Sequence, residues 1–122
     1  MKIVYGYDIG SYATNPNHEK LVKQVYESIA RHGIENYFIK YCSKSPVTVE
    51  MVYNSSQKYD VDPIMVAAIM QVDSNMGAKG LGSKTHNPGN VQNDDSGHIK
   101  DWGTWEAGVD AVSKNLAWRK VK

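Results

Sequence analysis

The sequence has few of the features that mark disulfide-stabilised, membrane-spanning or nucleic-acid-binding proteins. Its 122 residues contain one cysteine, Cys42, so no internal disulfide can form, and a lone thiol is most simply a small core residue. No apolar run is long enough to span a membrane or to act as a signal peptide. The formal net charge is +1 and the basic residues are scattered, which indicates neither nucleic acid nor another strongly charged partner.

Metal and cofactor binding are not indicated either. The four histidines are isolated, and none has the short spacing to a second histidine or cysteine that is typical of zinc sites. Asp94 and Asp95 are adjacent carboxylates, but the spacing of a calcium-binding EF-hand loop is absent. We therefore predict no metal and no cofactor, and we interpret these two aspartates as turn residues.

The sequence does contain helical patterning, in a chain long enough for one domain with a core. Residues 1–17 are expected to form an irregular or short extended arm. A helix is predicted over 18–32 and ends at Gly33, and a short second helix follows to Cys42. The apolar side chains expected on the inner face of the first helix are Leu21, Val22, Val25, Tyr26 and Ile29.

The next helix is predicted to start at Pro46, capped by Ser45, and to run to about Tyr59. The predicted organisation is one mainly α-helical domain over 1–122, with an N-terminal helical arm (1–45) packed on a core (46–122).

The stretch 61–90 organises the rest of the chain. Asp62 is a good N-cap and Pro63 suits the first position of a helix, where a missing N–H has no consequence. The apolar run that follows, Ile64 to Met70, predicts a helix that is covered on most sides. Gly77 is placed to end this helix with a left-handed C-cap.

Asp73 lies in the last turn of this predicted buried helix. The negative end of the helix dipole and apolar surroundings both favour the protonated carboxyl, which is what a general acid needs. The alternative is a carboxylate that faces solvent and hydrogen-bonds the loop. The loop over 77–90 is rich in glycine and amide side chains, which suits either a ligand with hydroxyl and acetamido groups or an ordinary turn.

Residues 91–102 are interpreted as a small β-hairpin with its turn at 95–97. Trp102 follows, either lining a groove where its ring can stack on a sugar or packing as a structural residue. Thr104 is expected to cap the last helix. The inner face of that helix is predicted to be Trp105, Val109, Val112 and Leu116.

Three motifs together resemble the lysozyme-like superfamily, and within it bacterial and phage peptidoglycan-cleaving domains of the endo-β-N-acetylglucosaminidase and lytic transglycosylase type. They are the acid-Ser-x-x-Gly of residues 73–77, the Asn-Pro-Gly-Asn of residues 87–90 and the Trp-Glu-x-Gly-Val of residues 105–109. The resemblance covers roughly residues 46–118. It implies a lysozyme-like helical domain with a central buried helix and a small hairpin. This chain departs from the family in having Asp73 where the family usually has Glu, and it lacks the Ala-Tyr-Asn motif of many lytic transglycosylases.

The resemblance implies cleavage of β-1,4 glycosidic bonds in peptidoglycan, whose strands alternate GlcNAc and MurNAc, with Asp73 as general acid and base. A second catalytic carboxylate is not identifiable; Asp94, Asp95 and Asp101 are the candidates. One acid suffices where the 6-hydroxyl or the 2-acetamido group of the sugar attacks the anomeric carbon, and the resemblance does not separate these routes. The candidate glycan-binding residues are Ser74, Thr85, Asn87, Asn90, Gln92 and Trp102.

Shortening Glu to Asp withdraws the carboxyl by about 1.5 Å, the length of one C–C bond. This leaves two alternatives to a fully active enzyme: a glycan-binding or structural module with weak or lost activity, and an engineered Glu→Asp variant of an active parent. A small helical interaction protein is a third class. As a wall-cleaving enzyme without a signal peptide, the chain is expected to reach the cell wall by a route such as phage lysis, or as one domain of a longer product.

Overall fold

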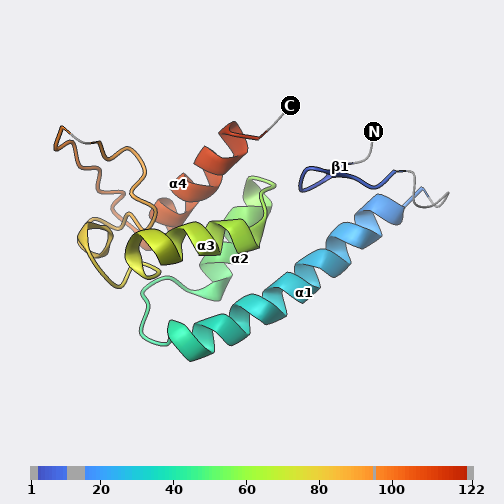
Figure 1. The fold of residues 1–122 in the computed structure, drawn as a ribbon, viewed down its shortest axis with the longest axis horizontal. Coiled ribbons are helices and arrows are strands. Elements are labelled where there is room, and N and C mark those ends of the chain that lie inside the picture. Colours follow the sequence, from blue (N-terminus) through green and yellow to red (C-terminus); the bar gives the residue numbers. More distant parts are fainter. Residues whose placement is uncertain (1–2, 11–15, 95, 121–122) are drawn as a thin grey trace.

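The computed structural model describes residues 3–10, 16–94 and 96–120, and it is mainly helical. In chain order its elements are β1 (Ile3–Val4), β2 (Tyr7–Asp8), α1 (His18–Tyr41), α2 (Val49–Lys58), α3 (Pro63–Ser74), the 3₁₀ turn η1 (Leu81–Ser83) and α4 (Trp105–Trp118). Helices α2 and α3 each contact both α1 and α4. Figure 1 shows that the loop after α3 lies at the opposite end of the molecule from β1. No helix in the described ranges is long and apolar enough to cross a membrane.

The only strands in the described ranges pair as a two-residue hairpin at the N-terminal end, where a short extended arm was expected. β1 and β2 are antiparallel, with Val4 opposite Tyr7. The connecting residues Tyr5 and Gly6 both have positive φ, which is typical of the turn that matches the twist of a tight hairpin. The Tyr5 hydroxyl donates to the Glu27 carboxylate at 2.8 Å, which fixes the hairpin to α1.

Helix α1 is continuous from residue 18 to residue 41, so the prediction that Gly33 ends it is wrong. Its buried stripe is Ala30, Ile34 and Phe38, spaced by four residues across the glycine. Burying Ile34 and Phe38 is worth about 1.5–3 kcal/mol each, which outweighs the roughly 1 kcal/mol that a glycine costs inside a helix. The predicted inner face of the first half is wrong at three of its five positions, because Leu21, Val25 and Ile29 are exposed, whereas Val22 and Tyr26 are half-buried.

Helix α2 begins at Val49, three residues later than predicted. Thr48 is its N-cap and accepts a hydrogen bond from the Met51 N–H. The Ser45 hydroxyl accepts from the Val47 N–H instead and donates to the Met76 carbonyl, so it fixes the chain before α2 to the end of α3.

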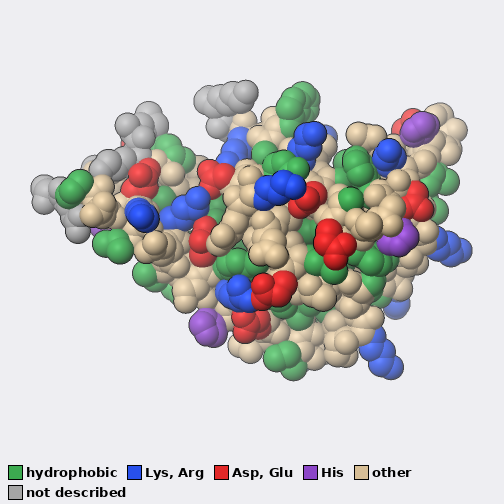
Figure 2. All heavy atoms as spheres, turned by 180° about the vertical axis from the view of Figure 1, so that it is seen from behind, with side chains coloured by type: hydrophobic (Ala, Val, Ile, Leu, Met, Phe, Trp, Pro, Cys, Tyr) green, Lys and Arg blue, Asp and Glu red, His purple; other side chains and the backbone are tan. Residues whose placement is uncertain are grey.

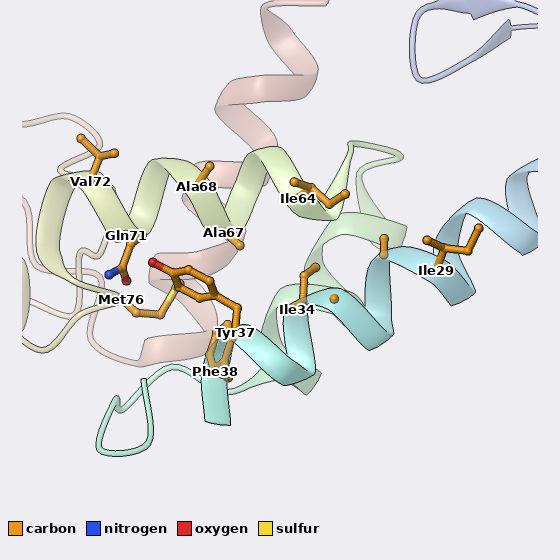
Figure 3. Close-up of a pocket in the computed structure, with 12 residues that line it drawn as sticks. Ile29, Ile34, Tyr37, Phe38, Ile64, Ala67, Ala68, Gln71, Val72 and Met76 are labelled. Atoms are coloured by element: carbon orange, nitrogen blue, oxygen red, sulfur yellow. The ribbon is translucent and has the colours of Figure 1, made fainter. Parts of the chain in front are cut away.

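Helix α3 starts as predicted, with Asp62 accepting from the Ile64 N–H and Pro63 in the first turn. The prediction that it is covered on most sides is wrong. Its buried residues form one stripe at spacings of three and four, while Ile64, Met65 and Val72 are exposed, Val72 by 85%. Figure 3 shows Tyr37 reaching from α1 toward Gln71 across an apolar hollow of about 560 Å³ between the two helices.

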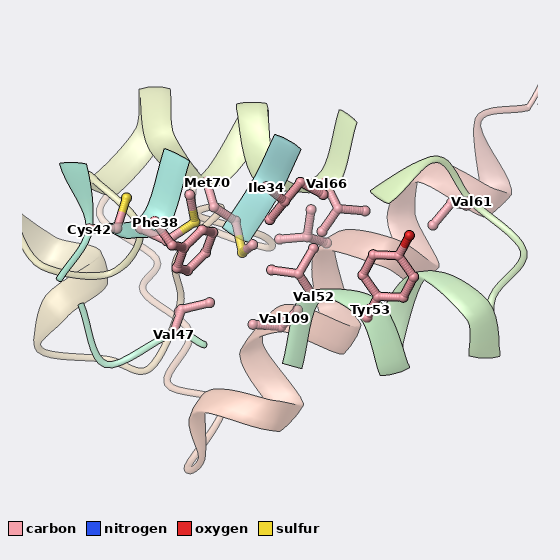
Figure 4. Close-up of a cluster of buried hydrophobic side chains, with 12 residues drawn as sticks. Ile34, Phe38, Cys42, Val47, Val52, Tyr53, Val61, Val66, Met70 and Val109 are labelled. Carbon is pink, nitrogen blue, oxygen red and sulfur yellow. The ribbon is translucent and has the colours of Figure 1, made fainter. Parts of the chain in front are cut away.

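The core lies where the four helices converge. Figure 4 shows Phe38 of α1, Val52 of α2, Met70 of α3 and Val109 of α4 in one cluster, and Cys42 is buried at its edge as expected. Thr104 caps α4 by accepting from the Ala107 N–H, as predicted. The predicted inner face of α4 also packs on this cluster, with Val109 and Val112 buried and Trp105 and Leu116 partly buried.

Candidate functional site

The acid-bearing end of α3 is a sharp corner. The helix ends at Ser74, and Asn75, Met76 and Gly77 all have positive φ, at 48°, 58° and 83°. The left-handed cap is therefore Asn75, two residues before the predicted Gly77. Asparagine tolerates this conformation better than most residues, and Gly77 continues it without strain. Gly77 is also tightly packed, because a Cβ there would lie 2.7 Å from the Trp105 ring.

Ser74 joins this corner to the Asn-Pro-Gly-Asn loop. Its hydroxyl donates to the Pro88 carbonyl at 2.7 Å and accepts from the Gly77 N–H at 2.8 Å. The side-chain amide of Asn90 adds a contact of 3.4 Å to the backbone carbonyl of Asp73. The helix end and the loop are thus one unit. Because Ser74 is buried, any effect it has on a ligand is exerted through the position of its neighbours.

Asn87 holds the loop from inside. Its side chain is 0% exposed; the amide group donates to the carbonyls of Val91 and Lys100, and the amide oxygen accepts from the Val91 N–H at 2.8 Å. Thr85 is also buried, and its hydroxyl donates to Leu81. Both predicted binding residues therefore support the loop and do not line its surface.

The predicted hairpin over 91–102 is wrong, since the described part of this stretch contains no strand. Two backbone bonds join Asp94 to Gly97 and His98, and side chains make the other bonds of the turn in place of a backbone ladder. The Asn93 side-chain oxygen accepts from the Lys100 N–H at 2.9 Å. Asp94 accepts from Ser96 and from the His98 N–H, and the bond from the Ser96 hydroxyl is the largest of the causes that lower the pKa of Asp94. Asp94 is thus a turn residue, and Asp95 lies outside the described residues.

Asp101 also serves the local backbone. Its carboxylate accepts from the Gly103 N–H at 2.8 Å and contacts His86 Nδ1 at 3.1 Å, and these two bonds, in that order, lower its pKa. Asp94 and Asp101 are therefore both engaged in holding loops. In each of them Oδ1 accepts these bonds.

Asp73 is different, because its carboxylate has no hydrogen-bond or ion-pair partner among the described residues. It is exposed, so the expectation of apolar surroundings is wrong. The cause is the single buried stripe of α3: Ser74 and Met70 face the interior, and the neighbouring position 73 faces solvent.

A hollow of about 410 Å³ lies along α4, close to this corner in the chain. Two predicted binding residues line it, Gln92 and Trp102, and the Asn90 that contacts Asp73 is two residues before Gln92. The other polar and aromatic lining residues were not among the predicted binding residues. Four of them had a signal in the sequence, the spacing of polar and aromatic positions on the outer face of the last helix: Asp110, Lys114, Asn115 and Trp118. The fifth is Tyr59, the C-cap of α2, which had no such signal.

Comparison of the chain with protein-family models, with curated proteins and with solved structures finds no match. The class that the fold defines is therefore a mainly helical domain with a two-stranded antiparallel sheet. The lysozyme-like assignment remains a prediction from the three motifs.

Proposed function

We propose that this protein acts on the glycan strands of peptidoglycan and cleaves β-1,4 glycosidic bonds with Asp73 as the general acid. The observation that carries the proposal is the carboxylate of Asp73, which is exposed and has no partner among the described residues, on a corner whose contact residue Asn90 directly precedes Val91 and Gln92 in the lining of the hollow along α4. A strand lying in that hollow and over the corner would bring a glycosidic oxygen near this carboxylate.

The rigidity of the corner supports a catalytic reading. A misplacement of about 1 Å can reduce a rate by on the order of 10²-fold, so the backbone that carries a general acid must hold it in a fixed position. The Ser74 hydroxyl holds the loop against the end of α3 by a hydrogen bond of 2.7 Å, and the buried Asn87 amide holds the loop itself by bonds of 2.8–3.0 Å to Val91 and Lys100. These bonds are shielded from water, and breaking one leaves a buried group unpaired.

The mechanism needs one proton donor. Asp73 delivers its proton to the leaving oxygen, and an oxocarbenium-like centre forms at the anomeric carbon. Asp94 and Asp101 both hold loops through Oδ1, which supports a route in which a group of the sugar attacks, either the 6-hydroxyl or the 2-acetamido group. Because Asp73 is exposed in the free protein, the bound glycan itself is what removes its carboxyl from water.

A glycan-binding module without turnover is the competing proposal, and two observations favour it. The carboxyl is one methylene shorter than the usual Glu, and it is open to solvent. Under this reading the hollow along α4 binds the strand while Asp73 does not reach the glycosidic oxygen.

The two proposals differ in the effect of changing Asp73. We expect wild type to release soluble fragments from purified peptidoglycan, Asp73→Asn to release at least about 10²-fold less because the proton donor is lost, and Glu106→Gln to match wild type. Glu106 is a suitable control because it is an exposed carboxylate outside the hollow. Equal release by wild type and Asp73→Asn would refute the assignment. Release by Asp73→Glu but not by wild type would support the binding module, because it would show that the shorter Asp73 side chain does not reach the glycosidic oxygen.

A further inference from the structure

The hollow along α4 is built on one face of that helix. Its α4 residues lie at positions 107, 110, 111, 114, 115 and 118, which is the spacing of a single face over three turns. At 1.5 Å per residue this face is about 16 Å long. The small side chains of Ala107 and Ala111 line it on α4, together with the residues 91, 92 and 102 and with Tyr59, the C-cap of α2. The shape is an elongated groove whose volume lies within the range of small-molecule sites.

Three aromatic rings line the groove, those of Tyr59, Trp102 and Trp118, and they differ in whether a cation covers one face of the ring. Lys58 Nζ lies 5.4 Å from the ring centroid of Tyr59, and Lys100 Nζ lies 5.0 Å from that of Trp102. Each of these two rings therefore has a cation over one face. In the described part of the chain, no cation or ring covers Trp118, which is 79% exposed. A large aromatic side chain left this open at one end of a groove is a stacking surface for a ligand with an apolar face.

Polar groups surround the alanine floor and keep hydrogen-bonding capacity. Asp110 contacts Lys58 through Oδ2 at 3.1 Å, and the Asn115 side-chain oxygen accepts from Arg119 at 2.7 Å. Within the described ranges, Asp110 Oδ1 and the Asn115 amide group have no partner. An acceptor and a donor are thus presented about one and a half helical turns apart, beside exposed Lys114 and Gln92.

The geometry points to a saccharide-binding groove along α4, with Trp118 as a stacking platform and Asp110 and Asn115 as hydrogen-bonding partners for hydroxyl and acetamido groups. A pyranose has both an apolar C–H face and a ring of hydroxyls, which matches aromatic walls interleaved with neutral and mixed-charge polar groups. A nucleotide fits less well, because Lys114 is the one lysine that lines the groove in the described part of the chain, and Lys58 beside Tyr59 is paired with Asp110, so a row of phosphates finds a single uncommitted cation. Figure 2 shows acidic and basic side chains interspersed over the face seen from behind, and the net charge is +1.

The inference rests on the proposed function for the choice of ligand, β-1,4-linked N-acetylglucosamine. It adds where the strand lies. Gln92 is close in the chain to Asn90 and the Asp73 corner, whereas Trp118 lies at the far end of α4. A strand in the groove therefore extends from Asp73 toward Trp118, and Trp118 contacts sugar units remote from the bond that is cut.

The test is calorimetric titration with chitotetraose, a soluble β-1,4-linked N-acetylglucosamine oligomer. Every protein carries Asp73→Asn so that no turnover occurs during the titration. We expect Trp118→Ala to weaken binding about tenfold and Trp118→Phe to retain most of the affinity, because the stacking surface is lost in the first and kept in the second. Asn115→Ala is expected to weaken binding less, by a few-fold.

Ile39→Ala is the matched control, since Ile39 is an exposed apolar residue of α1 that lines neither hollow. Unchanged binding by Trp118→Ala and Asn115→Ala, equal weakening by Ile39→Ala, absence of chitotetraose binding, or tighter binding of AMP would each overturn the inference. Failure of the groove and failure of the function are separable. Peptidoglycan cleavage that groove variants do not affect would reject the groove alone, and groove binding with no cleavage by wild type would reject the catalytic role of Asp73 alone.

Discussion

Two helical glycines are expected to respond in opposite directions to the same substitution. Gly33 lies in the middle of α1, and a Cβ there would meet nothing within 4 Å. Gly108 lies in the first turns of α4, where a Cβ would fall 2.0 Å from the His86 carbonyl oxygen and 2.8 Å from Pro88. Alanine is favoured over glycine in a helix by about 1 kcal/mol, and both positions gain that amount.

At Gly33 nothing opposes the gain, so Gly33→Ala should raise the free energy of unfolding by about 0.5–1 kcal/mol. At Gly108 the new methyl group must displace a backbone carbonyl, which cannot rotate away as a side chain can. Overpacking typically costs about 1–3 kcal/mol, and a contact this short belongs at or above the upper end of that range. After the gain of about 1 kcal/mol for alanine in a helix, Gly108→Ala should lower the free energy of unfolding by about 2 kcal/mol or more.

Thermal unfolding followed by circular dichroism measures both changes, at roughly 4 °C per kcal/mol for a domain of this size. A lower Tm for Gly33→Ala would mean that α1 breaks at Gly33, as the sequence pattern indicates, and would refute the continuous helix. A higher Tm for Gly108→Ala would mean that α4 does not pack against the loop at His86.

Two further predictions concern the stability of the loop and of one ion pair. Asn87→Ala should destabilise the protein by about 2–4 kcal/mol in denaturant titrations, because it removes three hydrogen bonds of a fully buried side chain and leaves part-buried Val91 and Lys100 backbone groups unpaired; a loss under about 0.5 kcal/mol would contradict these hydrogen bonds. The hydrogen bond from Lys23 is the largest of the causes that lower the pKa of Asp60 in the folded protein. The Asp60 carboxylate therefore stabilises the fold above its unfolded-state pKa, and this stabilisation is lost as the pH falls through the lowered folded-state pKa. Asp60→Asn should therefore reduce stability at neutral pH, by no more than about 1 kcal/mol because the pair is exposed, and should match wild type in acid; a difference that persists in acid would show that the effect does not arise from this charge.

Local signals predicted the helix starts that depend on adjacent residues. Asp62 with Pro63 and Thr104 before α4 cap their helices as expected, because a cap is decided by side chains within three residues of the N–H groups they accept from. Helix ends were less predictable. A glycine such as Gly33 is typical of the position that follows a helix, and only the packing of Ile34 and Phe38 on α2 and α3 explains why α1 continues.

The sequence does not indicate which side chains of α3 and of the site are buried and which are exposed. Apolar composition gave no means of telling Val66, which is fully buried, from Val72, which is exposed, since the difference depends on which neighbouring helix lies on each side. The same limit applied to Asp73, because a one-residue shift around the helix separates its exposed carboxylate from the buried Ser74. The hairpin predicted near Asp94 failed because side-chain bonds close that loop, and such bonds leave no alternating pattern in the sequence.

The most direct test of the central claim is mass spectrometry of the soluble fragments that wild type and Asp73→Asn release from purified peptidoglycan. If Asp73 is the general acid, wild type releases fragments that end at a cleaved β-1,4 bond, and Asp73→Asn releases none. Anhydromuramic ends would identify attack by the 6-hydroxyl, and reducing ends would identify hydrolysis. The same fragments in the same amounts from Asp73→Asn, or none from wild type, would contradict the claim that Asp73 is the acid of a glycan-cleaving enzyme.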